Sequence, residues 1–398
     1  MTHITKAFVG AKIHDGRNLY ADHALVVGKG DLLSVRPKGS LPQGCPTHVL
    51  KGGIIMPGFV DLQVNGGGGV MFNDDQSVRA LRTIAQAHQA TGTAAILPTL
   101  ITDTIERTRK AIDAVEQAIA DGVGGIVGIH LEGPHLSVAR KGAHDPNLIR
   151  TMTDEDLAIL QDAADRLPNV MVTLAPENAT SDQIKILSDA GIVVSLGHTD
   201  ADFATCMGAF DAGARCVTHL FNAMSQMGNR EPGLVGATLV RDDICAGLIA
   251  DGIHVHPATI RAALAACDHS ERIFLVTDAM ATAGSSIQKF SINGRDVFRK
   301  DQRLTLADGT LAGADLEMPR AIAVMREQVG DSETLAIRRA TSAPTALLRE
   351  PGQFGRLAKG LETVVHCNDD FTSISRLHMK DPALAQGQHS RRPVISSP

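Results

Sequence analysis

The sequence predicts an α/β fold, a (β/α)8 TIM-type barrel with a small β-domain added to it. Between residues 54 and 279, eight short apolar runs alternate with stretches of helical periodicity. Runs that are apolar throughout are typical of strands buried on both faces, and a helix after each strand indicates a parallel sheet. Eight such units in about 230 residues suit a closed barrel better than an open sheet.

Residues 1–53 precede this pattern and predict a small antiparallel sheet. Apolar runs at 6–13, 23–28 and 32–36 are separated by turns rich in Gly, Asp and Pro. Such spacing is typical of short strands joined by tight turns. We therefore expect this segment to form the first part of a small β-domain beside the barrel.

The barrel is expected over residues 54–284. Its strands are predicted in the runs IIMPGFVDLQV (54–64), TAAILPTL (93–100), GIVGIHLEG (125–133), VMVTLAP (170–176), IVVSLGH (192–198), RCVTHL (215–220), ICAGLIAD (244–251) and IFLVTDA (273–279). Amphipathic helices are predicted between them at 76–91, 103–121, 153–166, 180–190, 201–212 and 257–268. Acidic residues, Ser or Thr at their starts favour helix N-termini.

Residues 285–313 return to short alternating runs, with turns at Asn293-Gly294 and Asp308-Gly309. We expect a β insertion or loop that closes the functional site, and the pattern suggests that it shares the small β-domain with the first segment. Residues 314–350 contain helical stretches that complete the barrel. Residues 351–398 are expected to return to the β-domain and to end, beyond 375, in a polar and poorly ordered tail.

The composition is that of an ordinary soluble globular protein, with 43% hydrophobic and 21% charged residues. A net charge of -6 without a basic run argues against nucleic acid as a partner. The N-terminus has no apolar signal-like region, and no apolar stretch approaches the roughly 18 residues that cross a bilayer. Six scattered cysteines fit free thiols in a reducing compartment, so we expect a cytoplasmic protein.

Four polar residues stand at the ends of predicted barrel strands: Glu132, His198, His219 and Asp278. The chemistry of such barrels lies at the C-terminal ends of the strands, where the loops converge. Two imidazoles and a carboxylate can hold one divalent metal, and a further carboxylate can move protons. A single residue of this kind is commonly a hydrogen-bonded structural group. If all four were structural groups of this kind, each would need its own hydrogen-bonding partner, because buried polar groups are costly unless paired. A shared functional site explains all four together.

Seven motifs in register carry a resemblance to a known family: HLEGP (130–134), KGAH (141–144), LGH (196–198), THLFNAM (218–224), REPG (230–233), ADGIH (250–254) and VTDA (276–279). The series resembles the N-acetylglucosamine-6-phosphate deacetylases of the amidohydrolase superfamily, over roughly residues 5–365. The resemblance implies a metal-bearing barrel, a small β-sandwich built from both chain ends, and a homodimer. It also implies hydrolysis of the acetamide of N-acetylglucosamine 6-phosphate to glucosamine 6-phosphate and acetate.

The chemistry of amide hydrolysis gives the four strand-end residues distinct expected roles. Glu132, His198 and His219 are expected to be three metal ligands that leave one position open, as in catalytic sites. This ligand set suits zinc, and iron, cobalt or manganese also fit it. We expect Asp278 to be the general base and then the general acid, a role that contributes about 10²–10⁴ in rate.

The remaining expected site residues follow from the resemblance. His254 would stabilise the oxyanion at the acetyl carbonyl, and Arg230 would bind the phosphate of the neighbouring subunit's substrate. The other expected substrate contacts are Ala143, His144, Asn222, Ala223, Leu311, Ala312 and Gly313. For Asn222 and Ala223 the expected donors are the backbone N–H groups. Taken alone, His254 reads as an ordinary loop histidine, and residues 311–313 read equally well as a plain turn.

Two departures from the family pattern bear on these expectations. Many amidohydrolases have His-x-His after the first barrel strand, whereas this chain has Gln63 and Asn65, which are weak ligands; we therefore expect one metal. The C-terminal segment also lacks clear final strands. Two alternatives stay open: a deacetylase of N-acetylgalactosamine 6-phosphate or a related amidohydrolase, and a non-catalytic barrel used for assembly.

Overall fold

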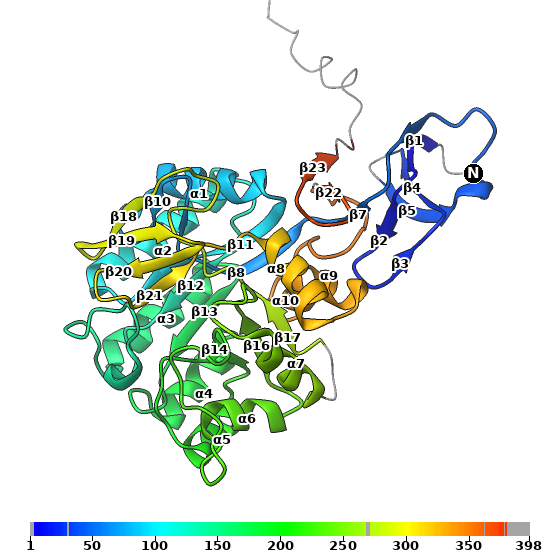
Figure 1. The fold of residues 1–398 in the computed structure, drawn as a ribbon. Helices are drawn as coiled ribbons and strands as arrows, with labels where there is room; N and C mark the ends of the chain where they lie inside the picture. Colours follow the sequence, from blue (N-terminus) through cyan, green and yellow to red (C-terminus); the bar gives the residue numbers. More distant parts are fainter. Residues whose placement is uncertain (1–3, 30–31, 268–270, 362, 378, 380–398) are drawn as a thin grey trace, which may run out of the picture.

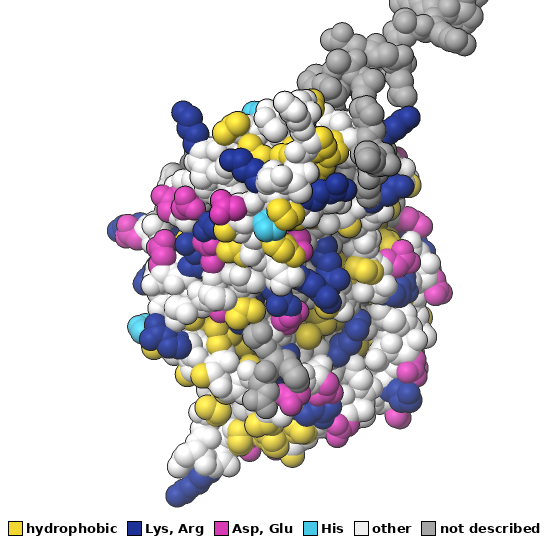
Figure 2. Space-filling model, turned by 90° about the vertical axis from the view of Figure 1, so that its right-hand side faces the viewer, with side chains coloured by type: hydrophobic (Ala, Val, Ile, Leu, Met, Phe, Trp, Pro, Cys, Tyr) yellow, Lys and Arg dark blue, Asp and Glu magenta, His cyan; other side chains and the backbone are white. Residues whose placement is uncertain are grey.

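The protein consists of a barrel with a β-sandwich on one side and a small sheet on the other (Figure 1). The structure is a computed structural model that describes residues 4–29, 32–267, 271–361, 363–377 and 379. Lys and Arg side chains are interspersed with Asp and Glu over the face drawn in Figure 2, in keeping with the modest net charge of -6. Within the described residues, none of the helices is both long and apolar enough to cross a membrane.

Eight parallel strands form the barrel, in the order of the chain. They are β8 (Phe59–Val64), β11 (Thr93–Ile101), β12 (Ile129–Glu132), β13 (Val170–Leu174), β14 (Val193–Leu196), β15 (Cys216–Val217), β16 (Cys245–Leu248) and β17 (Ile273–Leu275). The barrel closes where the segment after β17 meets β8: Asp278 N donates to Gln63 O (3.0 Å) and Asn65 N donates to Ala279 O (2.9 Å). The predicted fold class is confirmed, and each of the eight predicted runs contains a barrel strand. The first run, 54–64, is only partly in the barrel, because Ile54–Pro57 forms a strand of the β-sandwich.

Helices follow the strands and cover the outside of the barrel (Figure 1). They are α1 (Val78–Ala90), α2 (Ile105–Ala120), α3 (Asp154–Arg166), α4 (Ser181–Asp189), α5 (Phe203–Asp211), α6 (Gly233–Val240), α7 (Pro257–Ala265), α8 (Met318–Val324), α9 (Glu333–Ala340) and α10 (Ser342–Thr345). The starts of α1 to α5 have the expected caps, for example Thr153 and Thr180, whose hydroxyls accept backbone N–H bonds. The sequence analysis missed α6, because it is apolar and buried almost all round and so has no amphipathic period.

The β-sandwich consists of two sheets built from both parts of the chain. One sheet contains β1 (Ile4–Val9), β4 (His23–Gly28), β5 (Leu32–Pro37) and β6 (Thr47–Val49); the other contains β2 (Lys12–His14), β3 (Leu19–Tyr20), β7 (Ile54–Pro57), β22 (Val364–Cys367) and β23 (Ile374–Leu377). Phe8 and Leu25 of the first sheet share a core with Ile13, Ile55 and Val364 of the second. The final strands therefore exist although their sequence pattern is weak. The tail expected to be poorly ordered lies, beyond residue 379, outside the described residues.

A separate antiparallel sheet lies over the barrel mouth. It contains β18 (Lys289–Ile292), β19 (Arg295–Lys300), β20 (Arg303–Leu306) and β21 (Leu311–Ala314). The turn at Asn293-Gly294 joins its first two strands, with left-handed φ values of 48° and 74°. Its last strand pairs with the segment after β17, where Ala314 N donates to Asp278 O (2.9 Å).

The prediction that this insertion shares a β-domain with the N-terminal segment is wrong. Its strands form no ladder with the sandwich sheets. Instead, its apolar residues Ile292, Val297 and Leu304 are buried against Met71 and Met280 at the barrel mouth. The barrel covers the apolar face of this sheet, so a second sheet is not needed to bury it.

Candidate active site

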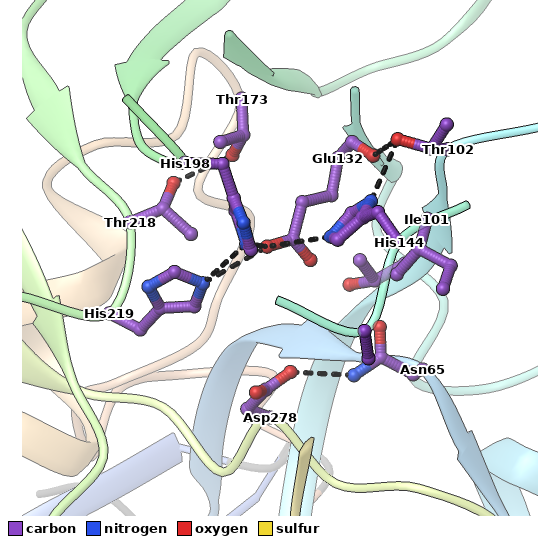
Figure 3. Close-up of polar contacts among 12 residues, drawn as sticks. Asn65, Ile101, Thr102, Glu132, His144, Thr173, His198, Thr218, His219 and Asp278 are labelled. Carbon is purple, nitrogen blue, oxygen red and sulfur yellow. Dashed lines mark hydrogen bonds and ion pairs between the residues drawn. The ribbon is translucent and has the colours of Figure 1, made fainter. Parts of the chain in front are cut away.

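The four polar strand-end residues meet at the C-terminal mouth of the barrel (Figure 3). Glu132 is the last residue of β12, while His198, His219 and Asp278 lie two or three residues beyond β14, β15 and β17. These three residues have left-handed backbones, with φ values of 48°, 32° and 50°. Such conformations are costly for residues other than glycine and persist where the surrounding structure enforces them, most often at functional sites.

The ligand atoms of Glu132, His198 and His219 lie within 4.8 Å of one another. Glu132 Oε1 is 3.0 Å from His198 Nε2 and 3.1 Å from His219 Nε2, and the two Nε2 atoms are 3.1 Å apart. All three side chains are buried. Burial raises the pKa of Glu132, but its hydrogen bonds with the two histidines outweigh burial and hold the pKa well below its usual range.

The donor set of this cluster fits a divalent metal ion. His198 Nδ1 lies 2.8 Å from the carbonyl oxygen of Arg140, which can only accept a hydrogen bond. The proton of the neutral ring is therefore on Nδ1, and Nε2 presents its lone pair to the cluster. Two imidazole nitrogens and one carboxylate oxygen that converge in this way are the ligands that zinc and related metals prefer.

Asp278 lies beside the cluster and is held by two amides. Its Oδ1 accepts hydrogen bonds from Asn65 Nδ2 (2.6 Å) and Gln63 Nε2 (3.2 Å). Gln63 Nε2 also donates to Glu132 Oε2 (3.2 Å) and so links the two carboxylates. Burial, with a smaller contribution from the charge of Glu132, raises the pKa of Asp278 to about 6. Asp278 is therefore a carboxylate at neutral pH and can still take up a proton.

We predict that each chain binds one metal ion tightly. Gln63 and Asn65 offer amide N–H groups to carboxylates, so neither presents the imidazole lone pair that a second metal would need. Elemental analysis of the purified protein should give close to one equivalent per chain, and the His219→Ala variant should hold far less. Two tightly held equivalents would contradict the prediction.

A cavity of about 400 Å³ opens above the cluster. The expected site residues that line it are Glu132, Ala143, His144, His198, His219, Asn222, Ala223, His254, Asp278, Leu311 and Gly313. Ala312 does not line it, because side chains alternate along β21 and that of Ala312 is buried on the opposite face. Arg230 is exposed on the loop before α6 and is also not among the lining residues.

Two expected contacts differ in detail from their predicted form. The backbone N–H of Asn222, expected to bind phosphate, donates to the His219 carbonyl oxygen (2.9 Å). His144 Nδ1 is 2.7 Å from Thr102 Oγ1, and its Nε2 is 3.9 Å from Glu132 Oε1. Burial holds the pKa of His144 well below its usual range, so its ring is neutral. His144 therefore lies against Glu132 of the metal-ligand cluster and also lines the cavity.

The sequence analysis missed several lining residues, including Arg140, Ile101, Met280, Ile292 and Thr310. Ile101 and Ile292 end strands of two different sheets. Their apolar side chains look like ordinary core positions in the sequence. One sequence feature could have indicated Thr310 as a lining residue. It is the turn at Asp308-Gly309, which places Thr310 and Leu311 at the start of β21.

At the mouth of this parallel eight-stranded barrel lie a metal-ligand cluster and a buried carboxylate. Together these features define a metal-dependent hydrolase with a TIM-barrel fold. Within that class, the chain belongs to the amidohydrolase family, whose model matches residues 54–362.

Relatives in this family match nearly the whole chain. An N-acetylgalactosamine-6-phosphate deacetylase from Shewanella sp. (strain ANA-3) is 39% identical over 96% of each chain. An N-acetylglucosamine-6-phosphate deacetylase from Haemophilus influenzae is 33% identical over 89% of this chain and 92% of its own. The crystal structure of an N-acetylglucosamine-6-phosphate deacetylase from Pasteurella multocida superposes with a TM-score of 0.86 at 34% identity, and covers 92% of this chain and 96% of its own.

Proposed function

We propose that this protein hydrolyses the acetamide of N-acetyl-D-glucosamine 6-phosphate to D-glucosamine 6-phosphate and acetate, in amino-sugar catabolism in the cytoplasm. The observation that carries the proposal is the convergence of Glu132, His198 and His219 beside Asp278 in one cavity. The names of the relatives point to this class of substrate.

The reaction requires an activated water and a protonated leaving amine. A divalent ion, zinc by preference, would be held by Glu132, His198 and His219, and would lower the pKa of bound water from about 15.7 towards about 7. Asp278 would accept the water proton and return it to the amine nitrogen. Its hydrogen bonds with Asn65 and Gln63 hold the carboxylate in place for both transfers.

The rest of the cavity would orient the substrate. His254, which lines the cavity, would donate a hydrogen bond to the acetyl oxygen as negative charge develops there. Ala143 and His144 would contact sugar hydroxyls, and Leu311 and Gly313 would cover the ligand from the mouth sheet. The backbone N–H of Ala223 and the side chain of Asn222 would contribute to the phosphate site.

The phosphate site would be completed in a homodimer. Arg230 is exposed and lies outside the cavity of its own chain, and a guanidinium can bind phosphate oxygens in a bidentate manner. Arg230 of one subunit would therefore reach the cavity of its neighbour.

We predict that Arg230→Ala raises KM for the phosphorylated sugar by about 10- to 100-fold, the size of the loss expected for charge-assisted hydrogen bonds. Turnover of N-acetylglucosamine without a phosphate should stay nearly unchanged. Steady-state kinetics with both sugars measure the difference, and Arg79→Ala, at an arginine whose side chain is 88% exposed, is the matched control. Equal losses on both sugars would count against a phosphate role.

N-acetylgalactosamine 6-phosphate is the second candidate substrate, because the relative at 39% identity is named for it. The two sugars differ in the direction of one hydroxyl group. An acetate-release assay on both sugar phosphates, with and without a chelator, tests the proposal. Metal-dependent release from the glucosamine derivative with the higher kcat/KM supports it, and a preference for the galactosamine derivative selects the second candidate. No release from either sugar would favour a non-catalytic barrel.

A further inference from the structure

Asp251 holds the backbone and the ring of His254 at the same time. It follows β16 in the loop that leads to α7, and it is only 4% exposed. Its Oδ1 accepts hydrogen bonds from the backbone N–H groups of Ile253 and His254, both at 2.8 Å. Its Oδ2 lies 2.6 Å from His254 Nδ1. One buried carboxylate thus fixes both the turn of the loop and the rotation of the imidazole.

The loop around this pair is itself fixed. Gly252 has a left-handed φ of 74°, which allows the chain to turn between Asp251 and His254. Arg320 of α8 donates to the Asp251 carbonyl oxygen (3.4 Å). Asp251 is not among the residues that line the cavity, whereas His254 is. Asp251 therefore reaches the reaction only through His254.

The hydrogen bonds define where the protons of the pair lie. Burial raises the pKa of Asp251, but the hydrogen bond with His254 and the backbone donors outweigh it, so the pKa is lowered and the group is an anion. An anionic carboxylate can only accept, so His254 Nδ1 carries a proton. Among the described residues, none is hydrogen-bonded to the other ring nitrogen, Nε2.

A neutral imidazole with its proton on Nδ1 cannot donate from Nε2. Donation to a substrate oxygen from Nε2 therefore requires a doubly protonated ring. The charge of Asp251, 2.6 Å away, compensates the charge of such a ring inside a buried site.

We propose that Asp251 is a positioning residue that holds the His254 ring in a fixed orientation and places its negative charge against Nδ1–H, so that the doubly protonated ring, the form that can donate from Nε2, is stabilised as the acetyl carbonyl is polarised. This proposal rests on the function proposed above. It differs from a purely structural role of Asp251, in which the carboxylate would only cap the backbone of its own loop.

A double-mutant cycle in the whole 398-residue chain separates the two roles. Asp251→Asn keeps the size of the side chain and removes its charge, and Asp251→Ser keeps a group that can cap the loop. Both variants should lower kcat by about 10- to 100-fold with little change in KM, while His254→Gln should lower kcat by about 10²–10³-fold, as for the loss of one oxyanion donor. In the His254→Gln background, either change at Asp251 should alter kcat by less than about twofold.

A substrate with a more reactive carbonyl provides a second measurement. The trifluoroacetamido analogue needs less polarisation, so the loss of kcat in Asp251→Asn should shrink severalfold on that substrate. The matched control is Asp156→Asn, because Asp156 is also buried and also accepts bonds from its own loop, at Thr153, but lies outside the cavity. It should keep the wild-type kcat on both substrates.

The outcomes distinguish this proposal from the proposed function. In one outcome the wild-type protein releases acetate, and the fold-losses of kcat caused by the Asp251 and His254 substitutions multiply in the double variant. This outcome would overturn the positioning role of Asp251 and leave the proposed function intact. An equal loss of kcat on the acetamido and trifluoroacetamido substrates would do the same. Wild-type protein that hydrolyses neither sugar phosphate would overturn the proposed function and this inference with it.

Discussion

Asp278→Asn is expected to lower kcat by at least two orders of magnitude, because it removes the group that accepts the water proton and returns it to the amine. The amide that replaces the carboxylate can still accept the hydrogen bond from Asn65 (2.6 Å in the wild type), so the local structure should be kept. Acetate release under saturating substrate measures the effect.

The metal content and the unfolding temperature of this variant are its internal controls. Asp278 does not belong to the cluster of Glu132, His198 and His219, so elemental analysis should give the wild-type value. A variant that binds metal normally and turns over at the wild-type rate would remove Asp278 from the mechanism.

Removal of the metal is expected to reduce activity to the level of the uncatalysed background, and addition of a divalent ion should restore it. Without the cation, no group in the cavity lowers the pKa of water by the required amount. Dialysis against a chelator followed by titration with zinc, iron, cobalt or manganese measures both the loss and the recovery. The same titration identifies which metal gives the highest turnover.

Variants at histidines provide the controls for metal removal. His219→Ala should stay inactive when metal is added back, because it has lost one of three ligands. His366→Ala, at a histidine of β22 that bonds the Gly52 carbonyl oxygen, should behave like wild type. Full activity of chelated, metal-free wild-type protein would contradict the assignment of the cluster.

The barrel could be predicted from the sequence because its strands are continuous apolar runs and most of its helices are amphipathic. That signal failed at α6, whose apolar residues are buried on nearly every side. It also failed to assign the sheet β18–β21, since alternation in a strand shows that one face is buried but not which element covers it. In this protein the covering residues, such as Met71 and Met280, belong to the barrel mouth.

The centre of the site was predictable for a different reason. Parallel strands in a barrel end on the same face, so position in the chain was enough to bring Glu132, His198, His219 and Asp278 together. The side chains of Gln63 and Asn65 orient Asp278, but other orienting contacts were harder to predict, because they are made by backbone atoms. The Arg140 carbonyl that fixes the His198 tautomer is one such contact, and the carbonyl of His219 that engages the Asn222 N–H is another. Backbone groups are present at every position and leave no mark in a sequence.

The pairing of β21 with the segment that carries Asp278 has a consequence for how substrate preference can change within this fold. Asp278 is bonded through its own backbone to β8 on one side and to Ala314 of β21 on the other. Leu311 and Gly313, which face the cavity, lie on the same strand as Ala314. We therefore expect the hairpins before β21 to tolerate insertions and exchanges that reshape the roof of the cavity, while the proton carrier below keeps its place. Substrate selectivity could then change while the position of the catalytic carboxylate stays the same, although both depend on one ladder of backbone hydrogen bonds.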